Sequence, residues 1–202
     1  MMTNFLILHG LGGSTGGHWQ EWLSDQLKTR GHRVYFPQFP DWDRPDKERW
    51  LHQLKAVFSE IPENEPLSVV AHSLGCILWI HYAADAAARK VNRAILVSPP
   101  SPFRKVEAVR DFFPLPDDKG GLKRAAKKTL LVFSSDDPFL PPKDAPHYFG
   151  YGVPCMVLPE MGHINVPSGY GPWPGMLHFC LDDKLFLSDL LGASQVPYEE
   201  KN

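Results

Sequence analysis

The segment LSVVAHSLGCILWIHYAA, residues 67–84, contains a short apolar run, a turn of small residues and a longer apolar run. The first run, residues 67–70, has the composition of a strand that is buried on both faces. The second run, residues 76–84, has the length of a helix. Ser73 stands between the two runs, with Ala71 two residues before it and Gly75 two residues after it. The segment therefore predicts a strand, a tight turn that carries Ser73, and a helix.

Runs of the same kind recur along the chain, and helix-length segments separate several of them. These segments carry apolar residues at three- and four-residue spacing, which indicates amphipathic helices. The alternation predicts an α/β fold, with a mostly parallel sheet of about six strands, helices on both faces and right-handed crossovers. No segment between the runs can hold a large cap domain. The runs are residues 5–8, 34–36, 67–70, 94–97, 129–133 and 155–158.

The length and composition are those of one globular domain. The chain has 202 residues, of which 43% are hydrophobic and 22% are charged, so it can enclose a sizeable core. We predict a single domain over residues 1–192 and a flexible C-terminal tail over residues 193–202.

The charge and the cysteines argue against several classes of partner. A net charge of −2 provides no basic field for nucleic acid or a membrane surface, so we expect neither, and any protein partner stays open. Cys76, Cys155 and Cys180 form no CxxC pair or His/Cys cluster, which argues against a disulfide framework and a bound metal. The N-terminus shows no signal peptide or membrane span, so we expect a soluble, cytoplasmic protein.

Polar residues follow four of the apolar runs. In a parallel sheet, ligands bind at the carboxyl ends of the strands. The first run is followed by HGLGGS, residues 9–14, the third by Ser73, the fifth by Asp136 and Asp137, and the sixth by EMGH, residues 160–163. The glycine-rich loop lacks the spacing of a dinucleotide or phosphate site, so we expect no cofactor. A serine, an aspartate and a histidine should meet at one edge of the sheet.

Ser73 has the surroundings of a catalytic serine. A sharp strand-to-helix turn holds a serine hydroxyl clear of the sheet, beside a backbone N–H that can receive a developing oxyanion. The turn is crowded, so small residues are needed two positions before and after the serine. Ala71 stands where the G-x-S-x-G pattern has its first glycine, and a methyl group usually fits there. Taken alone, the pattern is also explained by a serine that caps a helix.

The sequence contains nine histidines, of which His163 is the best candidate for the base. It follows the last strand in a turn that contains glycine, from which the imidazole can reach Ser73. The carboxylate that orients His163 is Asp137 or Asp136, and we favour Asp137. An Asp–Pro pair such as 137–138 also forms turns, and the two roles are compatible.

Four of the other histidines are less suitable as the base. We expect the side chain of His72 to point away from Ser73, because neighbouring residues of an extended segment alternate in direction. His9, at the end of the first strand, should bond to loop backbone. His147 and His178 lie in helix-like segments and should be surface or packing residues.

Two backbone N–H groups are expected to form an oxyanion hole. The first is the amide of Leu74, the residue after the proposed nucleophile. The second comes from the loop after His9 and Gly10, either from Leu11 or from its neighbour Gly12. Glycine-rich sequence before a helix is equally explained by a flexible turn.

Several of these motifs, taken together, resemble one family. The sequence is similar to the small α/β-hydrolases of the retinoblastoma-binding serine hydrolase group over about residues 5–191. The resemblance implies a compact α/β-hydrolase fold and a catalytic triad of Ser73, Asp137 and His163, in which the catalytic aspartate immediately precedes a proline. The motifs are HGLG at 9–12, His18–Trp19, SLG at 73–75, DPFLP at 137–141 and Gly162–His163.

Candidate pocket residues come from the loops around this edge. Trp173, Trp19 and Trp42 could wall an acyl pocket, although a tryptophan beside an amphipathic helix usually belongs to the core. We include Gly12 in the pocket as a neighbour of the oxyanion donor. The segment 101–114 is either a short lid or, as we favour, a stripe that packs on the core.

These residues predict a serine hydrolase, and we favour a carboxylesterase that acts on small acyl esters through an acyl-enzyme. An amidase or peptidase would use the same triad. The alternative from another class is a binding or scaffold protein that keeps the fold without the activity.

Overall fold

The computed structural model describes residues 2–182. The tail predicted over residues 193–202, and the end of the domain predicted over residues 1–192, lie outside the described residues. The described part forms one six-stranded sheet, in which the strand order is β2-β1-β3-β4-β5-β6 and every pair is parallel. The strands are β1 (Asn4–Leu8), β2 (Arg33–Tyr35), β3 (Leu67–His72), β4 (Val91–Val97), β5 (Ala126–Ser134) and β6 (Cys155–Leu158).

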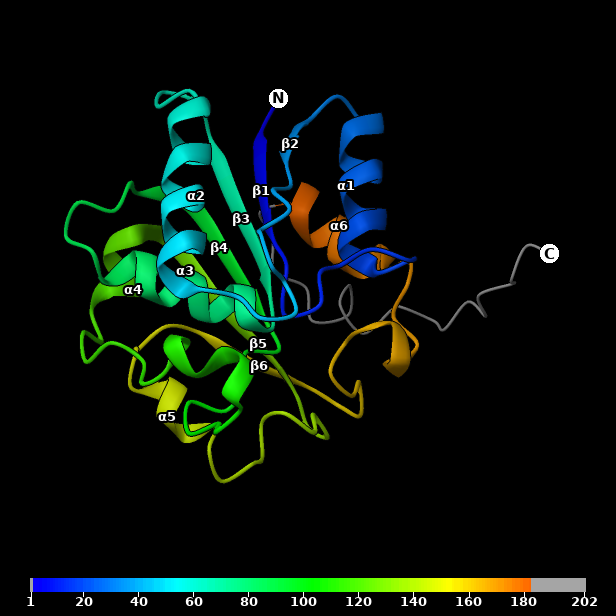
Figure 1. The fold of residues 1–202 in the computed structure, drawn as a ribbon. Coiled ribbons are helices and arrows are strands. Elements are labelled where there is room, and N and C mark those ends of the chain that lie inside the picture. The colour runs from blue at the N-terminus through cyan, green and yellow to red at the C-terminus, as the bar shows by residue number, and fades with distance from the viewer. Residues whose placement is uncertain (1, 183–202) are drawn as a thin grey trace.

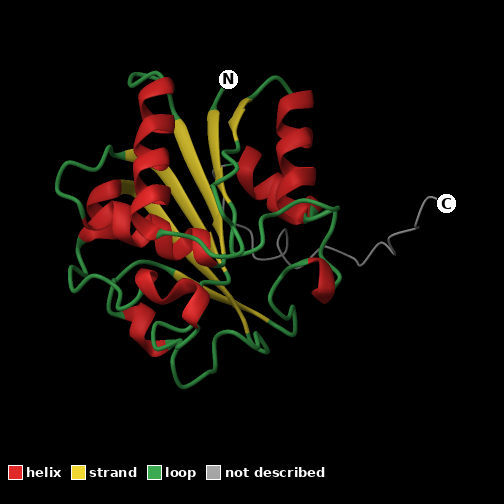
Figure 2. Cartoon of the chain, in the orientation of Figure 1, coloured by secondary structure: helices red, strands yellow, loops and turns green. Residues whose placement is uncertain are grey.

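Helices cover both faces of the sheet, as Figures 1 and 2 show. On one side lie α1 (Trp19–Thr29) and α6 (Pro174–Leu181). On the other lie α2 (Lys47–Glu60) and α3 (Leu74–Ala84). The shorter helices are α4 (Gly121–Ala125), α5 (Pro146–Phe149) and the 3-10 helices η1 (Glu107–Phe112) and η2 (Val166–Ser168). The predicted α/β architecture is confirmed, and residues 2–182 contain no large cap domain.

The strands divide the core into two clusters because successive side chains point to opposite faces. Along β3, Val69 and Ala71 join the cluster under α2 and α3, whereas Val70 joins the cluster under α1 and α6. Both faces of the central strands are therefore apolar, which explains why their sequences are continuous runs rather than alternating patterns.

Part of the segment after β4 packs on the core, which is the role that we favoured over a lid. Val109 and Phe112 of η1 are 4% and 0% exposed, and Phe112 makes an edge contact with Trp50 of α2. Among residues 2–182, no helix combines the length and the apolar character that are needed to cross a membrane.

Candidate active site

Ser73 lies in a strained turn between β3 and α3. Its backbone has φ 53° and ψ −122°, and a positive φ is unfavourable for a residue with a side chain. Two hydrogen bonds hold the turn. The Ser73 amide donates to the Val97 carbonyl at 2.9 Å, and the Cys76 amide donates to the Ser73 carbonyl at 2.9 Å. Ser73 makes no side-chain cap on α3, so its hydroxyl is left for another partner.

Close backbone packing explains the small residues around Ser73. A Cβ atom at Gly75 would lie 2.5 Å from the Leu8 carbonyl oxygen, and one at Gly10 would lie 2.8 Å from the Ser73 Cβ. Neither position has room for a methyl group. Ala71 is different, because its methyl group enters the core below α3. This explains why alanine fits in place of the first glycine of the pattern.

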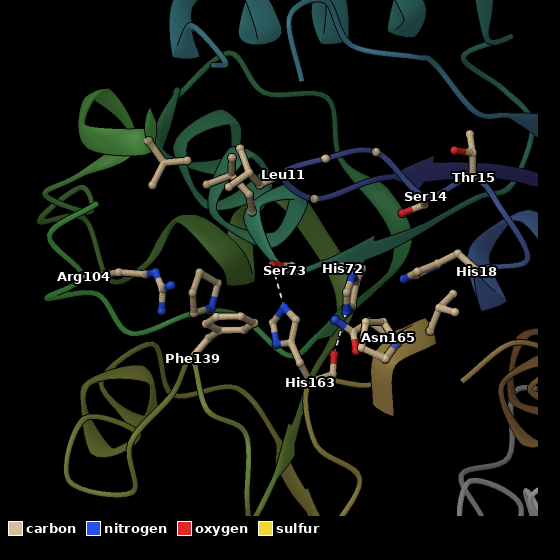
Figure 3. Close-up of a pocket in the computed structure, with 18 of the residues that line it drawn as sticks. Leu11, Ser14, Thr15, His18, His72, Ser73, Arg104, Phe139, His163 and Asn165 are labelled. Carbon is tan, nitrogen blue, oxygen red and sulfur yellow. Dashed lines mark hydrogen bonds between the residues drawn. The ribbon is translucent and has the colours of Figure 1, made fainter. Parts of the chain in front are cut away.

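Ser73, His163 and Asp137 form one hydrogen-bonded chain. The distance from His163 Nε2 to Ser73 Oγ is 2.9 Å, and His163 Nδ1 lies 3.0 and 2.9 Å from the two carboxylate oxygens of Asp137. The ionised carboxylate only accepts, so Nδ1 carries the proton and Nε2 can accept the serine hydroxyl. The side chains of His163 and Asp137 are only 6% and 1% exposed. Figure 3 shows the contact between Ser73 and His163.

Asp136 binds the loop that carries His163 through hydrogen bonds. Its Oδ1 accepts hydrogen bonds from the Ser134 hydroxyl and from the Gly162 amide, both at 2.7 Å. The hydrogen bond from Ser134, and to a smaller extent that from Gly162, holds the pKa of Asp136 below its ordinary value. The sequence left two aspartates as candidates for the carboxylate that orients His163. The structure places Asp137 against the His163 ring, whereas Asp136 binds the backbone of Gly162, the residue before His163.

Further contacts fix the position of the His163 turn. The indole N–H of Trp19 donates to the Ile164 carbonyl at 2.8 Å, and His72 Nε2 lies 2.9 Å from the His163 carbonyl oxygen. Our expectation that His72 points away from the site is wrong, because the turn after β6 crosses the face of β3 where the His72 ring lies. Its ring centroid is 4.9 Å from that of His163.

His9 orients the loop that is expected to supply the second oxyanion donor. The Phe39 amide donates to His9 Nε2 at 2.9 Å, so Nδ1 carries the ring proton and donates to the Gly10 carbonyl at 2.8 Å. The expected structural role of His9 is confirmed. The Gly10 carbonyl and the Leu11 N–H belong to one trans peptide, in which the two groups point in opposite directions. His9 therefore turns the Leu11 N–H away from itself.

The two candidates for the second donor differ in their partners. The Gly12 amide already donates to the Trp42 carbonyl at 3.0 Å. Within residues 2–182, the amides of Leu11 and Leu74 donate to no other protein group. Of the two alternatives, the amide of Leu11 is the one that is left for a ligand.

A cavity of about 360 Å³ opens beside Ser73, and Gly12 lines it as expected. Trp19 and Trp173 do not line it, which corrects our expectation for both. They are 0% exposed and make an edge contact with each other below the His163 turn. Trp42 also lies outside the cavity, where its ring packs against Gly13. The tryptophans that we expected in the pocket lie behind its wall and do not line the cavity.

Sequence reasoning missed other residues of the cavity wall. Figure 3 places Arg104 and Phe139 on one side of Ser73, and His18, Ser14 and Thr15 on the other. Phe139, which belongs to the DPFLP motif, makes an edge contact with the His163 ring at 4.4 Å between centroids. The motif was a signal for Phe139, whereas nothing in the local sequence marks Arg104.

His18 and His72 lie side by side in the cavity wall as neutral rings. Burial lowers the pKa of His18 to about 4, with smaller effects from His163 and His9. Burial also holds the pKa of His72 well below its ordinary value. The Gln20 amide donates to His18 Nδ1 at 3.2 Å, so the proton of His18 is on Nε2. Within residues 2–182, no group of three His, Cys, Asp or Glu residues could hold a metal ion.

The low pKa of His18 predicts a loss of stability in mild acid. The unfolded chain binds a proton near pH 6.5, whereas folded His18 stays neutral down to about pH 4. The free energy of unfolding therefore falls as the pH drops from about 7 towards 4, and does not depend on this group above pH 7. Between pH 7 and pH 5 the contribution of His18 is about 2 kcal/mol.

Urea unfolding of wild type and His18→Asn at pH 7 and pH 5 measures this contribution. Asparagine is a good N-cap, so the variant keeps an acceptor for the Gln20 amide and loses only the titration. We expect the variant to lose less stability between the two pH values than wild type does, by about 2 kcal/mol. An equal loss in both proteins would contradict the assignment.

The strand order and this arrangement of side chains define an α/β-hydrolase. Residues 5–180 match the model of the family described as serine hydrolase. The chain belongs to this family.

Relatives and solved structures agree with the class. YdeN of Bacillus subtilis (strain 168), a hydrolase by name, is 29% identical over 145 residues, which are 70% of this chain and 74% of YdeN. The crystal structure of the ydeN product superposes with a TM-score of 0.77 at 23% identity, over 89% of this chain and 97% of the other. The thioesterase domain of the curacin biosynthetic pathway gives a TM-score of 0.62 at 17% identity, over 90% and 91%. Est1E of Butyrivibrio proteoclasticus, solved with ferulic acid, gives a TM-score of 0.65 at 13% identity, over 89% of this chain and 88% of the other.

Proposed function

We propose that this serine hydrolase is a carboxylesterase that acts on small acyl esters through a triad of Ser73, His163 and Asp137. The observation that carries the proposal is the continuous chain of hydrogen bonds from the Ser73 hydroxyl through His163 to the buried Asp137 carboxylate. A serine is a weak nucleophile unless a base removes its proton, and this chain provides the base and the group that orients it.

In the proposed mechanism, Ser73 Oγ attacks the ester carbonyl while His163 Nε2 takes the hydroxyl proton. The Asp137 carboxylate stabilises the imidazolium that results. The amides of Leu74 and Leu11 donate to the oxyanion, and His163 then protonates the departing alcohol. Water, deprotonated by His163, attacks the acyl-enzyme; the acid leaves and Ser73 regains its proton.

The cavity supports a preference for small substrates. A volume of about 360 Å³ lies at the lower end of the range for small-molecule pockets. Leu11 and Val166, which line the cavity, are 43% and 45% exposed, so apolar surface is available to an acyl chain or an alcohol. Membership of the retinoblastoma-binding group and a cytoplasmic location stay predictions from the sequence.

A fluorophosphonate probe tests whether Ser73 is activated. In the folded protein, we expect Ser73 Oγ to attack the phosphorus of the probe and displace fluoride. Peptide mass spectrometry should then find one phosphonyl adduct, at Ser73. Heat-unfolded protein should stay unlabelled, because activation needs the assembled triad. A folded protein that forms no adduct would favour the scaffold alternative.

Matched substrates then separate an esterase from an amidase. We expect wild type to hydrolyse 4-nitrophenyl butyrate with a far higher kcat/KM than the corresponding butyryl 4-nitroanilide. A higher kcat/KM for the anilide would contradict the carboxylesterase and favour the amidase.

A further inference from the structure

Arg104 extends from the segment after β4 into the wall of the cavity that contains Ser73 (Figure 3). Its guanidinium carbon lies over the Phe139 ring, 4.4 Å from the centroid. The Phe139 ring in turn contacts the His163 ring, with 4.4 Å between the centroids. A half-buried positive charge is therefore held one aromatic ring away from the proposed catalytic imidazole.

No carboxylate of the described residues neutralises the charge of Arg104. Over residues 2–182, its guanidinium has no carboxylate partner and donates no hydrogen bond. Arg104 is also the single Lys, Arg, Asp or Glu residue among those that line the cavity. Four other arginines of the described residues pair with carboxylates, in Arg33–Glu65, Arg49–Asp41, Arg110–Glu107 and Arg124–Asp118.

The stacking on Phe139 leaves the hydrogen-bonding groups of Arg104 available. A guanidinium that lies over an aromatic ring uses its face, whereas its N–H donors point outward in the plane. These donors match the two oxygens of a carboxylate or the oxygens of a phosphate. Phe139 also restricts the side chain, which lowers the entropy lost when such a group binds.

The two sides of the cavity differ in chemistry. Beside Arg104 lie the apolar rings of Phe113 and Phe139, whereas the opposite side carries the neutral polar side chains of Ser14, Thr15, His18 and Asn165 (Figure 3). A substrate that fits both sides has an apolar portion that ends in a negative charge. The polar wall offers no second cation to compete for that charge.

We propose that the physiological substrate is an ester with an anionic group, a carboxylate or phosphate, a few atoms from the scissile carbonyl, and that Arg104 binds this group. Arg104 is thus a specificity-determining residue. The proposal rests on the proposed function, since it names the substrate class of the same site.

Two pairs of esters test the proposal on the full chain. In the first pair the charge is on the acyl side: the 4-nitrophenyl ester of adipic acid with a free terminal carboxylate, against the same compound with a methyl ester at that end. In the second pair it is on the alcohol side: 4-(butyryloxy)benzoate against its methyl ester. The spontaneous hydrolysis of each compound is subtracted.

We expect wild type to prefer the charged member of one pair by about tenfold or more in kcat/KM, as one charge-assisted bidentate contact allows. Arg104→Gln should abolish this preference, so that kcat/KM for the charged ester falls by about tenfold more than kcat/KM for its neutral partner does. Arg104→Lys should keep part of it, because the charge remains and the planar fork is lost. Arg110→Gln, the same change at a residue outside the cavity that pairs with Glu107, should keep the full preference.

The two pairs show which side of the ester bears the charge, and a preference in either supports the proposal. It is overturned if wild type prefers neither charged ester, if Arg104→Gln lowers kcat/KM for charged and neutral esters equally, or if Arg110→Gln removes the preference as well. Neutral-ester hydrolysis that requires Ser73 would leave the proposed function intact in each of these cases. If no ester is hydrolysed in a manner that requires Ser73, the proposed function fails and this proposal fails with it.

Discussion

Ser73→Ala is expected to lower kcat for 4-nitrophenyl butyrate by roughly 10⁶-fold, the loss that follows removal of the serine from a comparable triad. The variant removes the atom that forms the acyl-enzyme. The backbone N–H donors of Leu74 and Leu11 remain, so slow hydrolysis above the rate in water should persist. Steady-state kinetics with high enzyme concentration, corrected for spontaneous hydrolysis, measures the effect.

His163→Ala and the double variant serve as the controls for this result. Because the serine and its base act as a unit, the double variant should lose little more activity than either single variant does. Far-ultraviolet circular dichroism checks that each variant is folded. Wild-type kcat in folded Ser73→Ala would exclude the proposed mechanism.

Asp137→Asn is expected to lower kcat by about 10⁴-fold, as the corresponding change does in a serine protease triad. The asparagine side chain keeps the size of the aspartate but can present an N–H to His163 Nδ1. The imidazole is then held in the tautomer whose Nε2 carries the proton, and it can no longer accept the Ser73 hydroxyl. The loss should appear in kcat, with KM for 4-nitrophenyl butyrate little changed.

Asp136→Asn is the matched control, since it makes the same chemical change one residue away. The Oδ1 of Asp136 acts as an acceptor for Ser134 and Gly162, and asparagine keeps that acceptor. We expect a loss of about fivefold or less, which corresponds to about 1 kcal/mol for the weaker hydrogen bonds of a neutral group. If Asp136→Asn lost more activity than Asp137→Asn, the two assignments would have to be exchanged.

The parallel arrangement of the sheet follows from features that the sequence displays directly. The central strands are buried on both faces, so they appear as continuous apolar runs, and their parallel arrangement places the residues after each run at one edge. Ser73 and His163 could be assigned on this basis, although they lie 90 positions apart. The long-range convergence was predictable because the topology of a parallel sheet determines it.

Choices between neighbouring residues could not be made in this way. Asp136 and Asp137 follow the same strand, and the conformation of one turn decides which carboxylate faces His163. Gly12 and Leu11 present the same difficulty, because the carbonyl that engages the Gly12 amide belongs to Trp42, in a loop 30 residues later. Such pairings depend on how separate loops pack against each other, which leaves no periodic pattern in the sequence.

The cavity wall was the least predictable part of the site. It is built from five separate segments, at the ends of β1, β3, β4, β5 and β6, so the identity of a side chain does not tell whether it faces the cavity or the layer behind it. Trp19 and Trp173 have the size and polarity of pocket residues, but their rings fill the space below the His163 turn. The sequence does not distinguish Arg104 from a surface arginine, and only the structure shows its guanidinium over the Phe139 ring.

The backbone of Ser73 has a consequence for the evolution of this chain. With φ at 53°, residue 73 occupies a conformation that glycine adopts without strain and that costs other residues of the order of 1–3 kcal/mol. A population of variants screened for heat resistance alone would therefore accumulate glycine at this position and lose the hydroxyl group. The serine at this position therefore costs stability that glycine would not cost, and what it adds is the hydroxyl group that contacts His163.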